Sequence, residues 1–232
     1  MPPKLVTIIP LPIGDNKSFI NEEFLNIIKK TKHYAVENIK TCRRFIASLK
    51  LEINIDDLYF ISLDKNTSLE DIRKQFESLE CENLGLMSES GCPGIADPGQ
   101  LIVKIAHEKG INVKPLIGPS SIILSLMASG LNGQNFAFIG YLPIQQNQRI
   151  HKIKELCKII LETQQTQIFI ETPYRNKSLL SDIIKYAHKE IKLCVAKNLT
   201  SIDEKIICLK IKDWKLINEE FHRVPCIYLL GI

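Results

Sequence analysis

The sequence predicts an α/β protein with two lobes. Apolar runs of strand length alternate with amphipathic helical patterns through most of the 232 residues. Two turn-rich loops, 88–99 and 118–121, each stand between a short apolar run and a helical pattern. The last three strand-like runs follow one another without long helices between them, which is typical of a mixed, partly antiparallel sheet. We therefore expect an N-terminal lobe with a parallel sheet, 1–117, and a C-terminal mixed lobe, 118–232.

Strands and helices alternate in the first lobe. Three apolar runs predict strands at Leu5 to Ile9, His33 to Val36 and Leu84 to Met87. Helical spacing predicts two helices, one through Ile20, Phe24, Ile27 and Ile28, and one through Leu69, Ile72, Phe76 and Leu79. A capping-box pattern, with Thr67 as the cap and Glu70 three residues later, precedes the second of these helices.

A third helix follows the loop at 88–99. Asp97 suits the N-cap, Pro98 the first helical position, and Gly110 ends the apolar stripe. Ile111 to Ile117 predicts a short or edge strand, because Pro115 lies inside it.

The second lobe begins with a helix from about Ser121 to Ser129 that stops at Gly130. Strands follow at 136–140, 168–170, 193–196, 206–211 and 226–230. A helix over 150–161 has an inner face of Ile150, Ile153, Leu156, Cys157, Ile160 and Leu161. Another helix is lined by Leu179, Leu180, Ile183, Ile184 and Ala187.

Composition sets broad limits on function. The net charge of +4 is compatible with an RNA partner and equally with an ordinary soluble enzyme. Seven scattered cysteines without a C-x-x-C pair predict reduced thiols in a cytoplasmic protein. No apolar run reaches the length of a membrane span, and the N-terminal residues run into a strand without a signal-peptide pattern. No metal-ligand spacing is present, so we expect no metal site.

Several common site motifs are absent, and polar loops at strand ends remain. The chain has no P-loop, no G-x-G-x-x-G and no G-x-S-x-G elbow. Polar or turn residues instead follow successive predicted strands, at 12–15, 37–38, 89–99, 118–121, 171–175 and 197–200. Because strand ends of an α/β sheet converge, these loops predict a ligand site with backbone amides, hydroxyls and carboxylates.

The ordered set of loops resembles the tetrapyrrole-methylase-like superfamily of S-adenosylmethionine-dependent class III methyltransferases. Within it, the chain is most similar to the branch that methylates a cytidine ribose 2′-hydroxyl in small-subunit ribosomal RNA. The resemblance runs through 12–14, Glu37 with Arg43, 89–99, 118–120, 140–143, 171–175 and 197–200. Members usually read A-T-P-I-G-N, A-E-D-T-R and D-A-G-T-P where this chain has Pro10 to Asp15, Val36 to Lys40 and Glu89 to Pro93. The segment 144–148 also lacks the usual basic pair, so a paralogue with a shifted target remains open.

The resemblance implies a cofactor cleft between the two lobes. The residues expected around S-adenosylmethionine are Pro12, Glu89, Ser90, Gly91, Cys92, Pro93, Ile95, Ser120, Ser121, Glu171, Thr172 and Asn198. Ser120 and Ser121 also suit helix capping, and the two roles are compatible. Catalysis of this kind depends mainly on positioning the methyl donor and the acceptor.

Two carboxylates are candidates for the general base, Glu89 and Glu37, because each directly follows a predicted strand. The alternative is that each accepts hydrogen bonds from loop amides. For Asp97 a structural N-cap is favoured over catalysis, and for Cys92 a small loop residue over a nucleophile.

Arg43, Arg149 and Arg175 are candidate contacts to RNA phosphates, with a solvated surface charge as the alternative for each. The predicted function is methyl transfer from S-adenosylmethionine to an RNA ribose, by a cytoplasmic homodimer that acts on the small ribosomal subunit. A tetrapyrrole methyltransferase and a non-catalytic cofactor- or RNA-binding protein are the alternatives. The glycine-rich first loop usual in the tetrapyrrole branch is absent here.

Overall fold

A computed structural model describes residues 2–63, 67–217 and 219–232. Within these ranges the chain forms two compact units, Met1–Ser120 and Ser121–Ile232, and each contains a five-stranded sheet. No helix in the described ranges is both long and apolar enough to cross a membrane.

The sheet of the first unit is wholly parallel. Its strands are β1 (Leu5–Ile8), β2 (His33–Val36), β3 (Tyr59–Ser62), β4 (Asn83–Met87) and β5 (Asn112–Pro115), in the order β3-β2-β4-β1-β5. Pro115 lies on an edge strand, where its missing N–H costs no ladder bond, so the predicted edge position is confirmed. All five strands point the same way, and their carboxyl ends therefore lie at one edge of the sheet.

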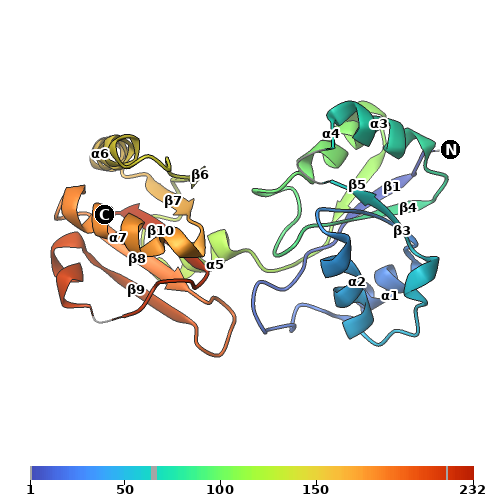
Figure 1. The fold of residues 1–232 in the computed structure, drawn as a ribbon, viewed down its shortest axis with the longest axis horizontal. Coiled ribbons are helices and arrows are strands. Elements are labelled where there is room, and N and C mark those ends of the chain that lie inside the picture. Colours follow the sequence, from blue (N-terminus) through green and yellow to red (C-terminus); the bar gives the residue numbers. More distant parts are fainter. Residues whose placement is uncertain (1, 64–66, 218) are drawn as a thin grey trace. The chain divides into compact units, whose positions relative to one another are not determined.

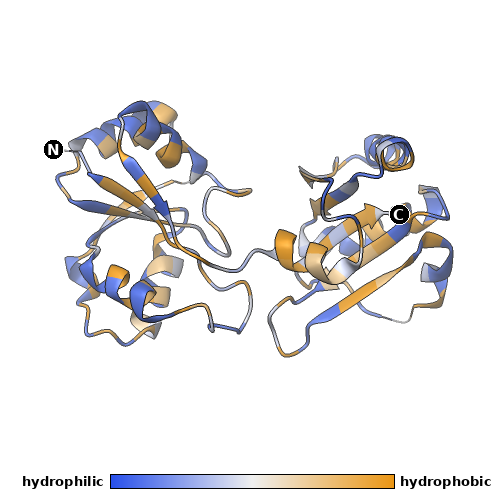
Figure 2. Cartoon of the chain, turned by 180° about the vertical axis from the view of Figure 1, so that it is seen from behind, coloured by the Kyte–Doolittle hydropathy of each residue, from blue (hydrophilic) through white to orange (hydrophobic). Residues whose placement is uncertain are grey.

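Helices cover both faces of this sheet (Figure 1). On one face α1 (Glu22–Lys30) and α2 (Ile39–Ser48) pack through Phe24, Ile28, Phe45 and Ile46. On the other face α3 (Leu69–Ser78) and α4 (Gln100–Glu108) pack through Ile72, Phe76, Ile102 and Ile105. The strands β2 and β4 contribute buried apolar residues to the core on both faces, as expected for the inner strands of a parallel sheet. Figure 2 shows the hydropathy of each residue along the chain.

The sheet of the second unit is mixed, as predicted. Its strands are β6 (Phe136–Tyr141), β7 (Thr166–Ile170), β8 (Lys192–Lys197), β9 (Lys205–Lys210) and β10 (Cys226–Gly231), in the order β6-β7-β10-β8-β9. Only the β6–β7 pair is parallel. The helices are α5 (Ser121–Ser129), α6 (Gln146–Thr163) and α7 (Asn176–Tyr186), with single 3-10 segments at η2 (Pro173–Arg175) and η3 (Ile211–Leu216).

Three local expectations are corrected by the structure. Ser68, not Thr67, caps α3: its hydroxyl accepts from the backbone N–H of Asp71 at 3.1 Å. Helix α4 begins at Gln100 with Gly99 at its N-cap, so Asp97 does not cap it. Leu161, expected on the inner face of α6, is half exposed.

Two elements were not predicted, namely β3 and α2. The signal for α2 was present in the sequence, because Asn38 caps the helix with its side-chain oxygen and Cys42, Phe45 and Ile46 recur at helical spacing.

Replacing Gly85 by alanine tests how tightly the first unit is packed. An added Cβ would lie 2.7 Å from Cδ1 of Tyr34 and 3.0 Å from Cδ1 of Ile9, both in the core. Overpacking of this kind costs roughly 1–3 kcal/mol. Urea unfolding followed by circular dichroism should therefore show a less stable first unit, whereas the fluorescence transition of Trp214 in the second unit should stay in place. Gly133→Ala, where the new Cβ meets nothing within 4 Å, is the control. Equal stability of Gly85→Ala and the wild type would contradict this packing.

Candidate active site

The loops that follow β1 and β4 are joined by backbone hydrogen bonds. The N–H of Leu11 donates to the carbonyl of Gly91 at 2.9 Å, and the N–H of Gly91 donates back to Leu11 at 3.1 Å. The Ser90 hydroxyl adds a bond of 3.2 Å to the carbonyl of Pro12. The structure therefore brings Pro12, Ser90 and Gly91, all expected around the cofactor, to one place at the edge of the sheet.

The two candidate bases lie beside each other at this edge. The backbone N–H of Glu89 donates to Oε2 of Glu37 at 3.4 Å. Asn38 connects to the same group, because its Nδ2 donates to Oε1 of Glu89 at 2.8 Å. Glu37 thus makes the bond to a loop amide that the sequence offered as its alternative role, while the carboxylate of the exposed Glu89 is oriented by an amide side chain.

Asn38 was not singled out as a functional residue from the sequence. Its Oδ1 accepts from the N–H groups of Lys40 and Thr41, so one side chain both caps α2 and holds Glu89. The sequence signal for capping was visible, but the contact with Glu89 spans 51 positions and needs the fold.

The loop at 88–99 is fixed by bonds within itself. Both carboxylate oxygens of Asp97 accept from the N–H of Gly94 at 2.9 Å, and one also accepts from Gly99 at 2.7 Å. Gly91 and Gly94 have φ angles of +70° and +86°, where a Cβ would be strained. Asp97 therefore shapes the loop instead of capping the helix.

Cys92 in the same loop behaves as a small thiol donor. Its Sγ lies 3.3 Å from the carbonyl oxygen of Pro119. Burial, with a contribution from the charge of Asp97, raises the pKa of the Cys92 thiol above its ordinary value. A thiol that stays protonated is a poor nucleophile, which agrees with the structural role expected for it.

An apolar pocket of about 430 Å³ lies within the first unit, beside this loop. Pro93 and Ile95 line it together with Pro10 and Leu116. The loop after β5 closes against the same region at Gly118, where an added Cβ would lie 2.1 Å from Cγ of Pro10. A pocket of this volume and apolar lining is of the size that holds small ligands.

Ser120 and Ser121 lie at the junction of the two units. Ser120, half-buried, is the last residue of the first unit, and Ser121 is the first residue of α5. The first N–H groups of a helix have no partners within it and attract anionic groups.

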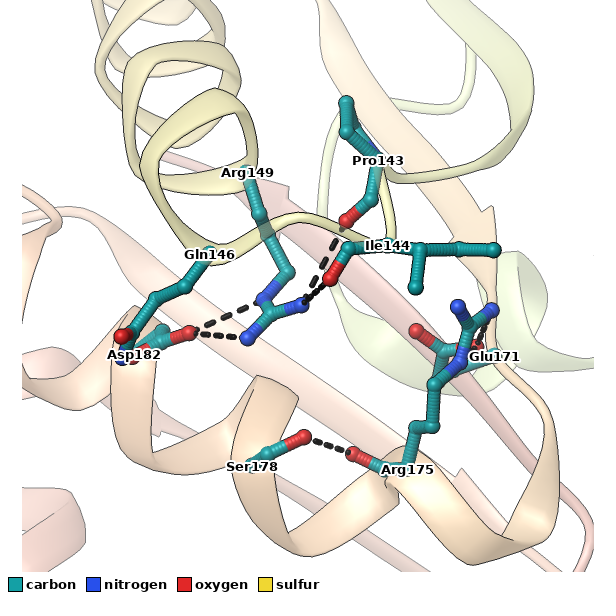
Figure 3. Close-up of polar contacts among 8 residues, drawn as sticks. All are labelled: Pro143, Ile144, Gln146, Arg149, Glu171, Arg175, Ser178 and Asp182. Carbon is teal, nitrogen blue, oxygen red and sulfur yellow. Dashed lines mark hydrogen bonds and ion pairs between the residues drawn. The ribbon is translucent and has the colours of Figure 1, made fainter.

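In the second unit, Glu171 and Arg175 form one cluster after β7 (Figure 3). Oε1 of the buried Glu171 accepts from the N–H of Thr172 at 2.6 Å and from Nε of Arg175 at 2.8 Å, and Nη2 of Arg175 also donates to it. Oε2 of Glu171 is buried without a partner. Nε of Arg175 also donates to the hydroxyl of Thr172 at 3.2 Å. Arg175, which we expected to contact the substrate, therefore bonds to Glu171 and Thr172, which we expected to contact the cofactor.

The buried Tyr228 lies near the same carboxylate, on β10. Burial, followed by Cys226 and Glu171, raises the pKa of the Tyr228 phenol, so the ring stays neutral. Its hydroxyl, like Oε2 of Glu171, is buried without a hydrogen-bond partner.

Arg149 lies inside the second unit (Figure 3). Its Nε and Nη2 donate to Oδ2 of the buried Asp182 at 2.9 and 2.6 Å, and its Nη1 donates to the carbonyl of Ile144 at 2.8 Å. Arg149 as a whole is 5% exposed, so its charge is not solvated at the surface, which was the alternative interpretation from the sequence. This pair ties the start of α6 to α7 and to the segment that precedes α6.

Arg43 is the most exposed of the three candidate phosphate contacts, with 41% of its side chain accessible. It forms an ion pair with Asp56 in the 3-10 segment η1 (Ile55–Asp57). The neighbouring Arg44 is exposed. Exposed ion pairs of this kind are weak and exchange readily for other anions.

Asn198 begins a strained loop between β8 and β9. Asn198 and Thr200 have φ angles of +49° and +68°, which is unusual for a β-branched threonine. The N–H of Asn198 donates to the carbonyl of Pro225, and its side chain donates to Asp203. Backbone strain of this kind is concentrated at functional sites, so this loop is a candidate part of the site.

Proteins of similar sequence match along most of the chain. A ribosomal RNA small subunit methyltransferase I from Vibrio cholerae is 31% identical over 202 residues, which are 87% of this chain and 67% of that protein. A protein of the same name from Buchnera aphidicola subsp. Acyrthosiphon pisum is 30% identical over 233 residues, 97% of this chain and 78% of that protein. No protein-family model matches the chain.

Solved structures share the fold. A uroporphyrin III C-methyltransferase from Thermus thermophilus superposes with a TM-score of 0.57 at 13% identity, covering 98% of this chain and 96% of that one. A diphthine synthase superposes with a TM-score of 0.63 at 15% identity, covering 98% and 89%. The expected fold of the tetrapyrrole-methylase-like class III methyltransferases is therefore confirmed.

Removing one partner of the Arg149–Asp182 pair should destabilise the second unit. Asp182→Asn leaves a buried guanidinium without its countercharge, which costs roughly 3–5 kcal/mol. Urea unfolding monitored by Trp214, which is buried in this unit, measures the loss. The matched control is Glu155→Gln, which breaks the exposed Lys152–Glu155 pair and should cost no more than about 1 kcal/mol. Similar small losses for both variants would mean that the buried pair is not a structural tie.

Proposed function

Because the chain belongs to the family of ribosomal RNA small subunit methyltransferase I, we propose that it transfers a methyl group from S-adenosylmethionine to a ribose 2′-hydroxyl of small-subunit ribosomal RNA. The observation that carries this proposal is that the sequence similarity extends over both units and includes the loops that form the candidate site. We place the reaction in the cytoplasm and propose that the chain acts as a homodimer, as the family resemblance implies.

The described residues are chemically suited to hold S-adenosylmethionine, which supplies an electrophilic sulfonium methyl group when bound. The apolar pocket lined by Pro93 and Ile95 suits an adenine ring. The first turn of α5, with Ser120 and Ser121, suits the carboxylate of the methionine part.

The other residues proposed around the cofactor supply polar groups. In the first unit these are the loop residues Pro12, Glu89, Ser90, Gly91 and Cys92. In the second unit they are Glu171, Thr172 and Asn198, of which Glu171 keeps a buried oxygen, Oε2, without a partner.

Glu89 is the proposed general base, with Glu37 and Asn38 as positioning residues. A ribose hydroxyl is a weak acid, so a carboxylate that accepts its proton during methyl transfer lowers the barrier. Oε1 of Glu89 is held by Asn38, and the backbone of Glu89 is held by Glu37. The exposure of Glu89 leaves its carboxylate accessible to an acceptor, whereas Glu37 is half-buried.

The three arginines divide by their surroundings. Arg43 is the proposed phosphate contact, because its ion pair with Asp56 is exposed and a phosphate can replace the carboxylate. Arg149 and Arg175 are proposed to act indirectly, since their donors are engaged with Asp182 and Glu171 and hold the segments that carry those residues.

Titration calorimetry tests the cofactor site. The wild type should bind S-adenosylmethionine without added metal, and Ser120→Trp should weaken binding at least tenfold, which is about 1.4 kcal/mol, because the indole fills the space beside the helix start. Ser78→Trp, at an exposed end of α3, is the control and should bind as the wild type does. No binding by the wild type would refute the methyltransferase proposal. Unchanged binding by Ser120→Trp would place the cofactor elsewhere.

Mass spectrometry of ribosomal RNA tests the substrate. Small-subunit RNA from a strain that lacks the gene should lose one ribose methylation, and the wild-type gene should restore it. Restoration by the Glu89→Gln gene should be strongly reduced, because an amide cannot accept the proton and general-base catalysis contributes about 10²–10⁴-fold to such rates. If every ribose methylation is the same with and without the gene, the proposed substrate is wrong.

A further inference from the structure

Two cysteines face each other across neighbouring strands of the second sheet. Cys194 on β8 lies directly opposite Cys208 on β9 in the antiparallel register. Directly opposed residues in such a pair have Cα atoms about 4.5–5.5 Å apart. A disulfide spans Cα separations of about 4.4–6.8 Å, so the strand register places the Cα atoms of the two cysteines within the range that a disulfide bridges.

The two thiols differ in exposure. Leu193 and Val195 belong to the core under α6 and α7, and side chains alternate along a strand, so Cys194 points to the opposite face of the sheet. Cys194 is fully buried, whereas Cys208 is partly accessible. A small reagent in solution therefore meets Cys208 first, and Cys194 lies behind it.

The thiols also interact electrostatically. The neighbouring Cys194 thiol, with a contribution from the positive charge of Lys192, lowers the pKa of Cys208 below its ordinary value, although burial acts in the opposite direction. The neighbouring Cys208, together with burial, raises the pKa of Cys194. Because Cys208 is the accessible member of the pair and its pKa is the lower one, it acts as the nucleophile. Cys194 keeps its proton until it reacts with the oxidised Cys208.

We propose that Cys194 and Cys208 form an oxidation site whose reactant is a small peroxide. The Cys208 thiolate attacks one oxygen of hydrogen peroxide, the O–O bond breaks, and Cys208 becomes a sulfenic acid while hydroxide leaves and is protonated to water. The sulfur of Cys194 then displaces the sulfenic oxygen, which leaves as a second water. Two thiols are oxidised by two electrons to one disulfide, and one peroxide is reduced to two waters.

The disulfide would form within the hairpin that carries the loop at 198–200. Three residue pairs separate Cys194–Cys208 from the turn, and the last of these pairs is Lys197 with Lys205. The turn carries Asn198 and Thr200, with their positive φ angles. The disulfide would therefore lock the hairpin that presents this strained loop, which goes beyond the proposed methyl transfer.

Peptide mapping of the full chain tests the proposal. The reduced protein is treated with hydrogen peroxide, quenched, alkylated with N-ethylmaleimide and digested with trypsin without reduction. Cleavage after lysine separates Cys194 and Cys208 into the peptides 193–197 and 206–210. The wild type should yield these two peptides joined, with a loss of two hydrogen masses, and dithiothreitol should release them.

One variant identifies the order of events, and a second is its control. In Cys194→Ser, Cys208 should be trapped by dimedone as the sulfenic acid, and no joined peptide should form. Cys81→Ser, which removes a half-buried cysteine of the first unit, is the control and should join 193–197 to 206–210 as the wild type does. The proposal is overturned if peroxide leaves both peptides alkylated, drives Cys208 to the sulfinic acid while Cys194 is alkylated, or joins either peptide to a different cysteine.

Discussion

The backbone bridge between Leu11 and Gly91 is the contact on which the candidate site of the first unit depends. The pairing of β1 with β4 ends before these residues, yet their two hydrogen bonds continue the connection beyond the sheet. The loops after two strands are therefore held together, and the loop after β5 lies against them where Gly118 approaches Pro10 closely. A rigid edge of this kind is what positional catalysis needs, because misplacing the reacting groups by about 1 Å can cost about a hundredfold in rate.

The acidic pair depends on the same edge. Glu37 and Glu89 follow two strands that are hydrogen-bonded neighbours, so the pairing of these strands brings the two residues close together. The side-chain oxygen of Asn38 caps α2, and its side-chain nitrogen donates a hydrogen bond to Glu89. The second unit uses a different means, since the buried side chains of Arg149 and Glu171 each form an ion pair with a residue on a neighbouring helix or 3-10 segment.

The sequence was informative wherever one residue's chemistry determines its local structure. Turn residues after apolar runs located the loops, and Pro115 marked an edge strand. It was less informative where a partner is remote. Arg149 stands among glutamines in an exposed-looking segment, and only the fold shows Asp182 across from it, 33 positions later. Asp97 before Pro98 has the pattern of an N-cap, but the amides of Gly94 and Gly99 compete for its carboxylate and the helix begins later.

Transfer of a labelled methyl group by the purified chain tests the central claim most directly. Small ribosomal subunits from a strain lacking the gene are incubated with the protein and S-adenosylmethionine labelled in its methyl group, and the RNA is digested to nucleosides. The account predicts that the label is recovered in a single 2′-O-methylated nucleoside. Label recovered on a base, or none transferred while the protein binds the cofactor, would contradict it.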